Sequence, residues 1–218
     1  MELNTVIFDM DGLLIDSEPL WNEAAAEVFS SYGRKLTDEE YATTTGLRTS
    51  EFVAWWLKDY NFDNTELERA GKRIIELVIE KVKAKPKALP GVHYIINFFT
   101  ERKFKIGLAT SSPVQLVDTV AELLGITPYL QAVSSAEALE YGKPHPQVYL
   151  NCAAQLNSSP LECICFEDSF NGMIAAKAAR MKCVVVPVQT QLKDNKWSAA
   201  DLKLSSLQNF SELHINLL

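Results

Sequence analysis

Four clusters of polar residues in this sequence have the types and spacing that chemistry on a small molecule would need. The first is Asp9–Gly12 (DMDG), which directly follows the apolar run Val6–Phe8. The others are Thr110–Ser112, the single Lys143, and Glu167–Asp168. Each has an ordinary explanation on its own, because Asp and Gly are frequent in turns and Ser caps helices. The presence of four such clusters in one chain indicates that they share one function.

The carboxylates of the first cluster suit phosphoryl transfer. Cleavage of a phosphate ester needs a nucleophile, a proton donor for the leaving alcohol, and positive charge near the phosphoryl oxygens. Asp9 is ionised at pH 7 and can form an aspartyl phosphate as the nucleophile. Side chains two apart on an extended segment point the same way, so Asp11 can act as general acid and then as the base that activates water.

The remaining clusters can bind the phosphate. Lys143 supplies a positive charge and is the third expected catalytic residue, after Asp9 and Asp11. Thr110 and Ser111 can donate hydrogen bonds to phosphoryl oxygens. We expect Ser112 to cap a helix that starts at Pro113. The free N–H groups at the start of that helix would favour an anion such as phosphate.

The acids also predict a metal ion. Asp9, Glu167 and Asp168 would crowd negative charge around an anionic substrate, and this arrangement needs a cation. Magnesium fits, because it prefers carboxylates, water and phosphate oxygens. We therefore expect Mg²⁺ as the cofactor.

Strands that alternate with helices position these clusters. The sequence predicts strands at residues 5–8, 104–110, 132–134, 163–167 and 183–188, separated by helical patterns. This order is typical of an α/β fold with a Rossmann-like, doubly wound parallel sheet. Ligands of such sheets bind at the carboxyl ends of the strands, where the four clusters fall.

A block of helical patterns interrupts this alternation directly after the first strand. We expect residues 1–14 and 86–218 to form the α/β catalytic core and residues 15–85 to form a helical cap domain. Ser17 is the expected N-cap of the first helix, and Thr37 and Thr65 each begin a capping-box pattern. The stretch KAKPKALPG ends the helical block.

Composition excludes several classes of protein. The net charge of −7 argues against a nucleic-acid binder or an anionic-membrane binder. No stretch resembles a spanning helix or a signal peptide, so we expect a cytoplasmic monomer that acts on a small phosphorylated metabolite. The four cysteines match no zinc pattern, and we expect them to be buried and apolar in character.

Taken together, the clusters resemble the four motifs of the haloacid dehalogenase-like hydrolase superfamily, in its phosphatase branch. The resemblance covers nearly the whole chain, and it includes a small helical cap inserted after the first strand. It implies that Asp9 and Asp168 bind magnesium and that Asp11 contributes its backbone carbonyl. Glu167 would be an outer or water-mediated partner of the metal.

Within that superfamily the chain is similar to the beta-phosphoglucomutase-like subfamily. The stretch FDMDGLLIDSEPLW (Phe8–Trp21) looks especially like bacterial phosphatases that act on deoxyhexose and hexitol phosphates. The mutases of the subfamily carry a cap histidine near the position of Trp21. This chain has a tryptophan there instead, and the difference favours hydrolysis over mutase activity.

Three alternatives stay open at this point. One is a hexose-phosphate mutase, which would pass the phosphoryl group to a second sugar. Another is a metabolite-binding module without turnover. A haloalkanoate dehalogenase is disfavoured, because dehalogenation needs neither magnesium nor Asp11.

The residues that choose the substrate are less evident. Arg48, at the start of a cap helix, could reach an anion or a sugar hydroxyl. Trp21, Trp55 and Trp56 could stack on a sugar. Trp55 and Trp56 are adjacent in the sequence, so these two cannot share one helix face.

Overall fold

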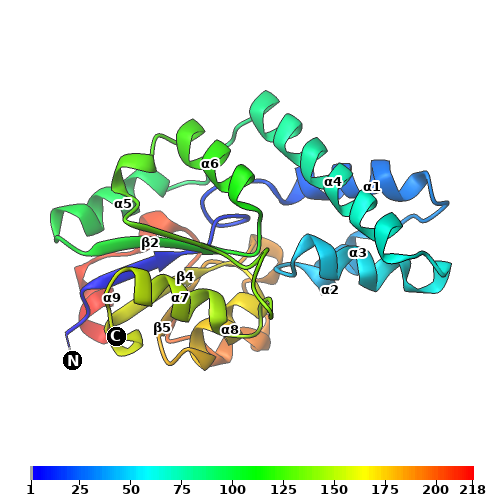
Figure 1. Ribbon diagram of the computed structural model, residues 1–218. Coiled ribbons are helices and arrows are strands. Elements are labelled where there is room, and N and C mark those ends of the chain that lie inside the picture. The colour runs from blue at the N-terminus through cyan, green and yellow to red at the C-terminus, as the bar shows by residue number, and fades with distance from the viewer. Residues whose placement is uncertain (1) are drawn as a thin grey trace.

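The computed structural model describes residues 2–218, and a parallel sheet of six strands forms its centre (Figure 1). The strand order is β3-β2-β1-β4-β5-β6, and each neighbouring pair is parallel. The strands are β1 Thr5–Phe8, β2 Lys105–Thr110, β3 Ala132–Ser135, β4 Cys163–Glu167, β5 Lys182–Val185 and β6 Leu202–Lys203. The order confirms the expected Rossmann-like core.

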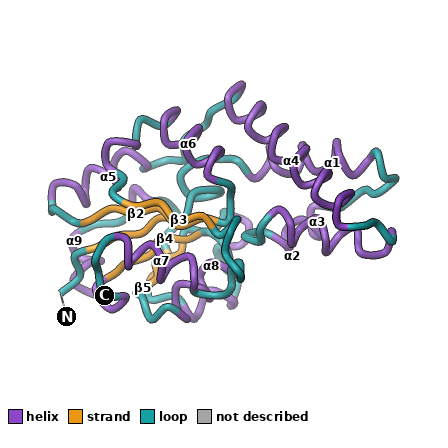
Figure 2. Tube along the Cα trace, in the orientation of Figure 1, coloured by secondary structure: helices purple, strands orange, loops and turns teal. Residues whose placement is uncertain are grey.

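Helices cover both faces of this sheet (Figures 1 and 2). One face carries α5 (Val92–Glu101) and α6 (Val114–Leu123), and the other carries α7 (Gln147–Gln155) and α8 (Phe170–Ala178). A last short helix, α9 (Glu212–Leu217), ends the chain. Short 3-10 helices occupy Lys58–Tyr60, Thr127–Tyr129, Pro160–Glu162, Gln189–Gln191, Asn195–Ala199 and Leu207–Asn209.

The strands alternate between the two faces, as the period of a pleated strand requires. Phe8 packs with the α5–α6 side, whereas its neighbour Ile7 packs with the α7–α8 side. Both are fully buried. The cysteines behave as the composition predicted, since all four are buried and free: Cys152, Cys163, Cys165 and Cys183.

Four of the five α-helices between β1 and β2 lie to one side of the sheet (Figures 1 and 2). They are α1 (Glu18–Ser30), α2 (Asp38–Thr44), α3 (Thr49–Leu57) and α4 (Asn64–Ala84). The longest, α4, has the buried stripe Ala70, Gly71, Ile74, Leu77, Val78 and Val82, and α1 and α3 pack against it. We call α1–α4 the helical block; the domain limits at 15–85 stay a prediction.

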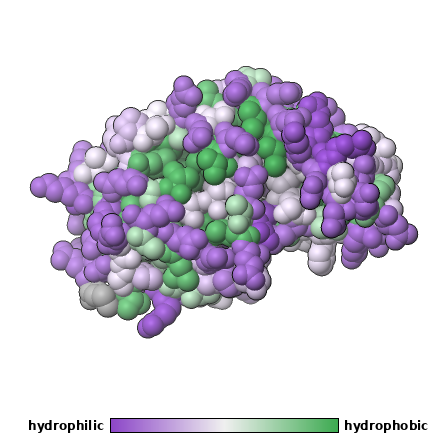
Figure 3. Space-filling model, in the orientation of Figure 1, coloured by the Kyte–Doolittle hydropathy of each residue, from purple (hydrophilic) through white to green (hydrophobic). Residues whose placement is uncertain are grey.

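In the face that Figure 3 shows, the end of the helical block farthest from the sheet is mostly hydrophilic. Among residues 2–218, no helix combines the length and the apolar character that crossing a membrane would need.

One expected helix start, at Ser17, is confirmed in position but lacks the capping hydrogen bond, and another, at Thr65, is wrong. Ser17 stands at the N-cap position of α1, but its hydroxyl does not cap the helix and donates to Asp11 instead. Asp63 caps α4 by accepting from the Glu66 backbone N–H, so Thr65 lies inside the helix. The capping box at Thr37 is confirmed.

The expected last strand is also shorter than the sequence predicted. It ends at Val185, two residues before Pro187, which lacks the N–H that a sheet ladder needs. The two-residue strand β6 was missed, since so short a segment carries no periodic signal.

Candidate active site

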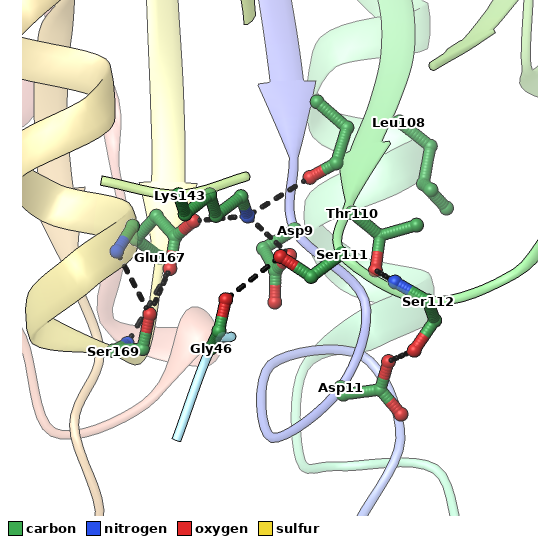
Figure 4. A network of polar contacts seen from close by, with 12 residues as sticks. Asp9, Asp11, Gly46, Leu108, Thr110, Ser111, Ser112, Lys143, Glu167 and Ser169 are labelled. Carbon is green, nitrogen blue, oxygen red and sulfur yellow. Dashed lines mark hydrogen bonds and ion pairs between the residues drawn. The ribbon is translucent and has the colours of Figure 1, made fainter. Parts of the chain in front are cut away.

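The sheet order brings the four polar clusters together. Strands β2 and β4 flank β1, and Phe8 pairs with both Leu108 and Phe166. Asp9, Thr110 and Glu167 therefore lie at the ends of three adjacent strands (Figure 4). The placement that the sequence predicted for these residues at one edge of the sheet is what the structure shows.

Lys143 lies at the centre of this edge and is almost fully buried. Its ammonium group contacts Asp9 Oδ1 at 2.7 Å and Glu167 Oε1 at 2.6 Å. It also donates to the Ala109 carbonyl at 3.1 Å and lies 3.4 Å from the Tyr149 hydroxyl. Burial alone lowers the pKa of Lys143, but the two carboxylates outweigh it and raise the pKa, so the lysine stays charged.

Asp9, Glu167 and Asp168 form a buried acidic cluster next to this lysine. Each offers a carboxylate oxygen, and these oxygens lie within 4.8 Å of one another. Burial raises the pKa of Asp9, Lys143 partly opposes this, and Glu167 adds to it. Burial and the charges of Asp9 and Glu167 raise the pKa of Asp168. Three acids and one lysine leave an excess of negative charge, and this donor set could bind a metal ion.

Two glycines allow the acids to approach so closely. Gly12 has a φ of +74°, and a Cβ there would lie 2.1 Å from Asp168 Oδ2. A Cβ at Gly172 would overlap the Glu167 carboxyl group at 1.9 Å. Any side chain at either position would displace an acid of the cluster.

The two oxygens of Asp9 have different surroundings. Lys143 holds Oδ1, whereas Oδ2 accepts no hydrogen bond from the residues that the structure describes. Glu167 differs, because Oε1 contacts Lys143 and Tyr149 and Oε2 accepts from Ser169. Glu167 therefore orients the lysine, and the free Oδ2 leaves Asp9 able to attack an electrophile or to bind a cation.

Asp11 accepts three hydrogen bonds that connect the core to the helical block. Oδ1 accepts from the Ser17 hydroxyl at 2.6 Å and from the Trp21 indole N–H at 2.9 Å, and Oδ2 accepts from the Ser112 hydroxyl at 2.6 Å. These contacts correct the expectation that Ser112 caps a helix, because Pro113 occupies the N-cap position of α6. They show that Ser112 orients Asp11.

Thr110, the last residue of β2, and Ser111, which follows it, have hydrogen-bond partners of their own. Thr110 is buried and accepts from the Ser112 backbone N–H at 3.1 Å. The Ser111 hydroxyl donates to the Gly46 carbonyl of the helical block at 2.7 Å (Figure 4). Phosphate binding by these three residues stays a prediction.

A cavity that opens to solvent lies between these residues and the helical block. Its core wall includes Asp9, Asp11, Lys143 and Asp168, together with Thr110, Ser111 and Ser112. Its other wall belongs to the helical block and includes Glu18, Trp21, Asn22, Tyr41, Thr45 and Phe52. We call this second wall the cap wall.

The remaining candidates for substrate recognition lie elsewhere. Arg48 does not line the cavity; it contacts the Leu139 carbonyl at 2.5 Å and Glu51 at 2.6 Å. Trp56 donates to Thr44 at 3.1 Å, and Trp55 is 54% exposed beside Lys58. A substrate role of Arg48 stays a prediction that this geometry does not favour.

Sequence reasoning missed three contributors to the site. The Ser17 hydroxyl donates a hydrogen bond to Asp11, and the Tyr149 hydroxyl donates one to Glu167. Glu18 lines the cavity. The sequence did carry a signal for Ser17 and Glu18, because they follow Asp11 closely at the start of the first helix. Tyr149 carries none, since it reads as an ordinary buried residue of an amphipathic helix.

Comparison with known proteins agrees with this geometry. Residues 6–186 match the family model of haloacid dehalogenase-like hydrolases. The chain is 42% identical over 207 residues to hexitol phosphatase B of Escherichia coli K12, covering 94% of this chain and 93% of that protein. It is 31% identical to a phosphorylated carbohydrates phosphatase of Thermotoga maritima, covering 89% of each.

Solved structures show the same fold. A beta-phosphoglucomutase of Clostridium difficile superposes with a TM-score of 0.89 at 23% identity, covering 98% of this chain and 96% of that one. The strand order, the acidic cluster around Lys143 and these similarities lead to one conclusion: the chain belongs to the haloacid dehalogenase-like hydrolase family, and its relatives identify it as a phosphatase of that family.

Proposed function

We propose that this protein is a Mg²⁺-dependent phosphatase that hydrolyses small sugar phosphates through an aspartyl phosphate on Asp9. The substrates are hexose, deoxyhexose or hexitol phosphates. The observation that carries the proposal is the position of Asp9, which lines the cavity and which Lys143 holds through one oxygen, while the other accepts no hydrogen bond from the described residues. The names of the relatives, hexitol phosphatase B among them, support this substrate class.

The first half of the reaction forms the covalent intermediate. Asp9 Oδ2 attacks phosphorus, the bond between phosphorus and the ester oxygen breaks, and Asp11 gives a proton to the departing alcohol. Lys143 keeps the Asp9 carboxylate oriented throughout. The Ser17 and Ser112 hydroxyls, each 2.6 Å from Asp11, fix the position of the proton donor.

The second half restores the enzyme. Water attacks the phosphorus of the aspartyl phosphate while Asp11, now a carboxylate, accepts a proton from it. The bond between phosphorus and Asp9 breaks, and inorganic phosphate leaves. The cap wall closes over this site, so the same residues that admit the substrate also determine how water reaches the intermediate.

The acidic cluster fits magnesium. Asp9, Asp168 and the backbone carbonyl of Asp11 would hold the ion, and Glu167 would support it through Lys143 and Ser169 rather than directly. When bound, Mg²⁺ would neutralise charge on the phosphoryl oxygens and bring the phosphate to the otherwise acidic floor.

We predict that Asp9→Asn lowers kcat by at least about 10³-fold, because it deletes the covalent step. The assay is phosphate release from glucitol 6-phosphate and from p-nitrophenyl phosphate. Asp118→Asn, an exposed change of the same chemistry on α6, serves as the matched control and should keep full activity. Hydrolysis by purified Asp9→Asn at the wild-type rate would refute the assignment of the nucleophile.

Chelation should abolish hydrolysis, and added Mg²⁺ should restore it. Ca²⁺ should restore it poorly, because its larger and looser coordination shell misplaces the attacking carboxylate. The measurement is the rate in EDTA and after addition of each metal. Full activity in EDTA would contradict the proposal and reopen the dehalogenase alternative.

Trp21→Phe should lower kcat for glucitol 6-phosphate about 10- to 100-fold, because it removes a hydrogen bond to the Asp11 carboxylate. The loss should be smaller for p-nitrophenyl phosphate, whose leaving group needs no proton, because this substrate needs Asp11 only as the base of the second half of the reaction. Trp197→Phe, which removes an indole N–H that donates to the Gln191 carbonyl, is the control. An unchanged kcat on both substrates, like that of the control, would show that Trp21 does not act through Asp11.

The mutase alternative makes a different prediction about products. A phosphatase releases inorganic phosphate in proportion to the substrate consumed, and we expect this stoichiometry. Product analysis of glucose 1-phosphate with a bisphosphate primer separates the two enzymes. Accumulation of glucose 6-phosphate faster than free phosphate would establish the mutase.

A further inference from the structure

The charges around the cavity are distributed unevenly. Among the described residues that line it, Lys143 is the only cation, and the charged residues besides it are Asp9, Asp11, Glu18 and Asp168. Lys143 lies on the core wall and already contacts two carboxylates. The cap wall therefore offers no positive charge, and it carries one acid, Glu18.

The rest of the cap wall is neutral and amphipathic. Asn22, Tyr41 and Thr45 present an amide and hydroxyl groups, while Trp21 and Phe52 present aromatic rings. Side chains of these kinds suit the hydroxyls and the C–H faces of a polyol. A second phosphate or carboxylate on the substrate would find no ion-pair partner there.

Glu18 is the first residue of α1, and it lines the same cavity as Asp11 and Asp168. Burial and the charge of Asp11 raise the pKa of Glu18 to about 7, while the Thr45 hydroxyl acts in the opposite direction. Above that pH the carboxyl group is ionised, and it repels any anion brought into the same enclosed space.

An adjoining outer cavity extends away from this region. It shares Glu18 with the first cavity, and Asp38 and Lys196 are the charged residues farther out. Lys196 contacts the Gln191 side chain at 2.9 Å and lies 3.7 Å from Asp194. The outer cavity therefore supplies no unshared cation for a second anionic group.

We infer that the cap wall admits only the uncharged, hydroxylated part of a phosphate monoester, and that Glu18 excludes substrates with a second anionic group. The inference rests on the proposed function and narrows it to monophosphates of neutral polyols and sugars. It also predicts that a sugar bisphosphate, which a mutase must hold, binds poorly to this protein.

Two linear sugar phosphates test the inference directly. Glucitol 6-phosphate and 6-phosphogluconate differ at the carbon farthest from the phosphate, which carries a CH₂OH group in the first and a carboxylate in the second. The kcat/KM of each is measured at pH 8, above the pKa of Glu18, for the wild type and for Glu18→Gln. Glu39→Gln, an exposed change of the same charge on α2, is the matched control.

We expect the wild type to prefer glucitol 6-phosphate by roughly tenfold or more, since an unpaired like charge in an enclosed site costs at least one power of ten. Glu18→Gln should reduce this preference about tenfold, chiefly through a lower KM for 6-phosphogluconate. Glu39→Gln should keep the wild-type ratio. The same ratio in the wild type and in Glu18→Gln would overturn the inference and leave the phosphatase activity standing.

A binding measurement decides the case in which neither compound is hydrolysed, an outcome that would count against the proposed function alone. Calorimetry with Mg²⁺ compares both compounds on Asp9→Asn and on the double variant Asp9→Asn/Glu18→Gln. The inference stands if the second substitution strengthens binding of 6-phosphogluconate relative to glucitol 6-phosphate. It is wrong if both proteins bind the two compounds with the same ratio of affinities.

Discussion

The ion pair between Lys143 and the two carboxylates beside it is the interaction on which the site depends. A lysine this deeply buried is stable only with anionic partners, and Asp9 and Glu167 are stable there only with a cation. Removing one member would leave an uncompensated charge in the core. Three strand ends and a loop are therefore held together by electrostatics at the point where apolar packing stops.

The same constraint explains the small residues around the cluster. Gly12 and Gly172 leave room for Asp168 and Glu167, which would otherwise be pushed away from the lysine. Tyr149 and Ser169 then complete the hydrogen bonds of Glu167. The outcome is an acidic floor that is rigid but undercompensated, and a divalent cation with an anionic substrate complements it.

Much of this arrangement could be predicted from the sequence because it follows from local patterns. Apolar runs that end in acids indicated the strands, and parallel-sheet topology brought the acids and Lys143 to one edge. The errors concern side chains with several available partners. Ser17 and Ser112 have the sequence context of helix caps, but both hydroxyls donate to Asp11, a partner 6 and 101 residues away.

Contacts between the helical block and the core were harder to predict. Arg48 has the sequence context of a residue that could bind a ligand, yet it binds the Leu139 carbonyl, 91 positions along the chain. Nothing in the local pattern of α3 indicates that partner. Trp21 was predicted as a substrate residue that could stack on a sugar, but its hydrogen bond to the Asp11 carboxylate depends on how α1 follows β1.

The turn at residues 45–46 of the helical block has a consequence for protein engineering. Ser111 donates to the Gly46 carbonyl, and Asn171 donates to the Thr45 carbonyl at 3.1 Å. A Cβ at Gly46 would lie 2.8 Å from the Ser169 hydroxyl. The helical block is thus no interchangeable module: a chimera that receives the cap of a relative must retain a glycine at this turn and both backbone acceptors, or the transplanted helices will not seat on the catalytic core.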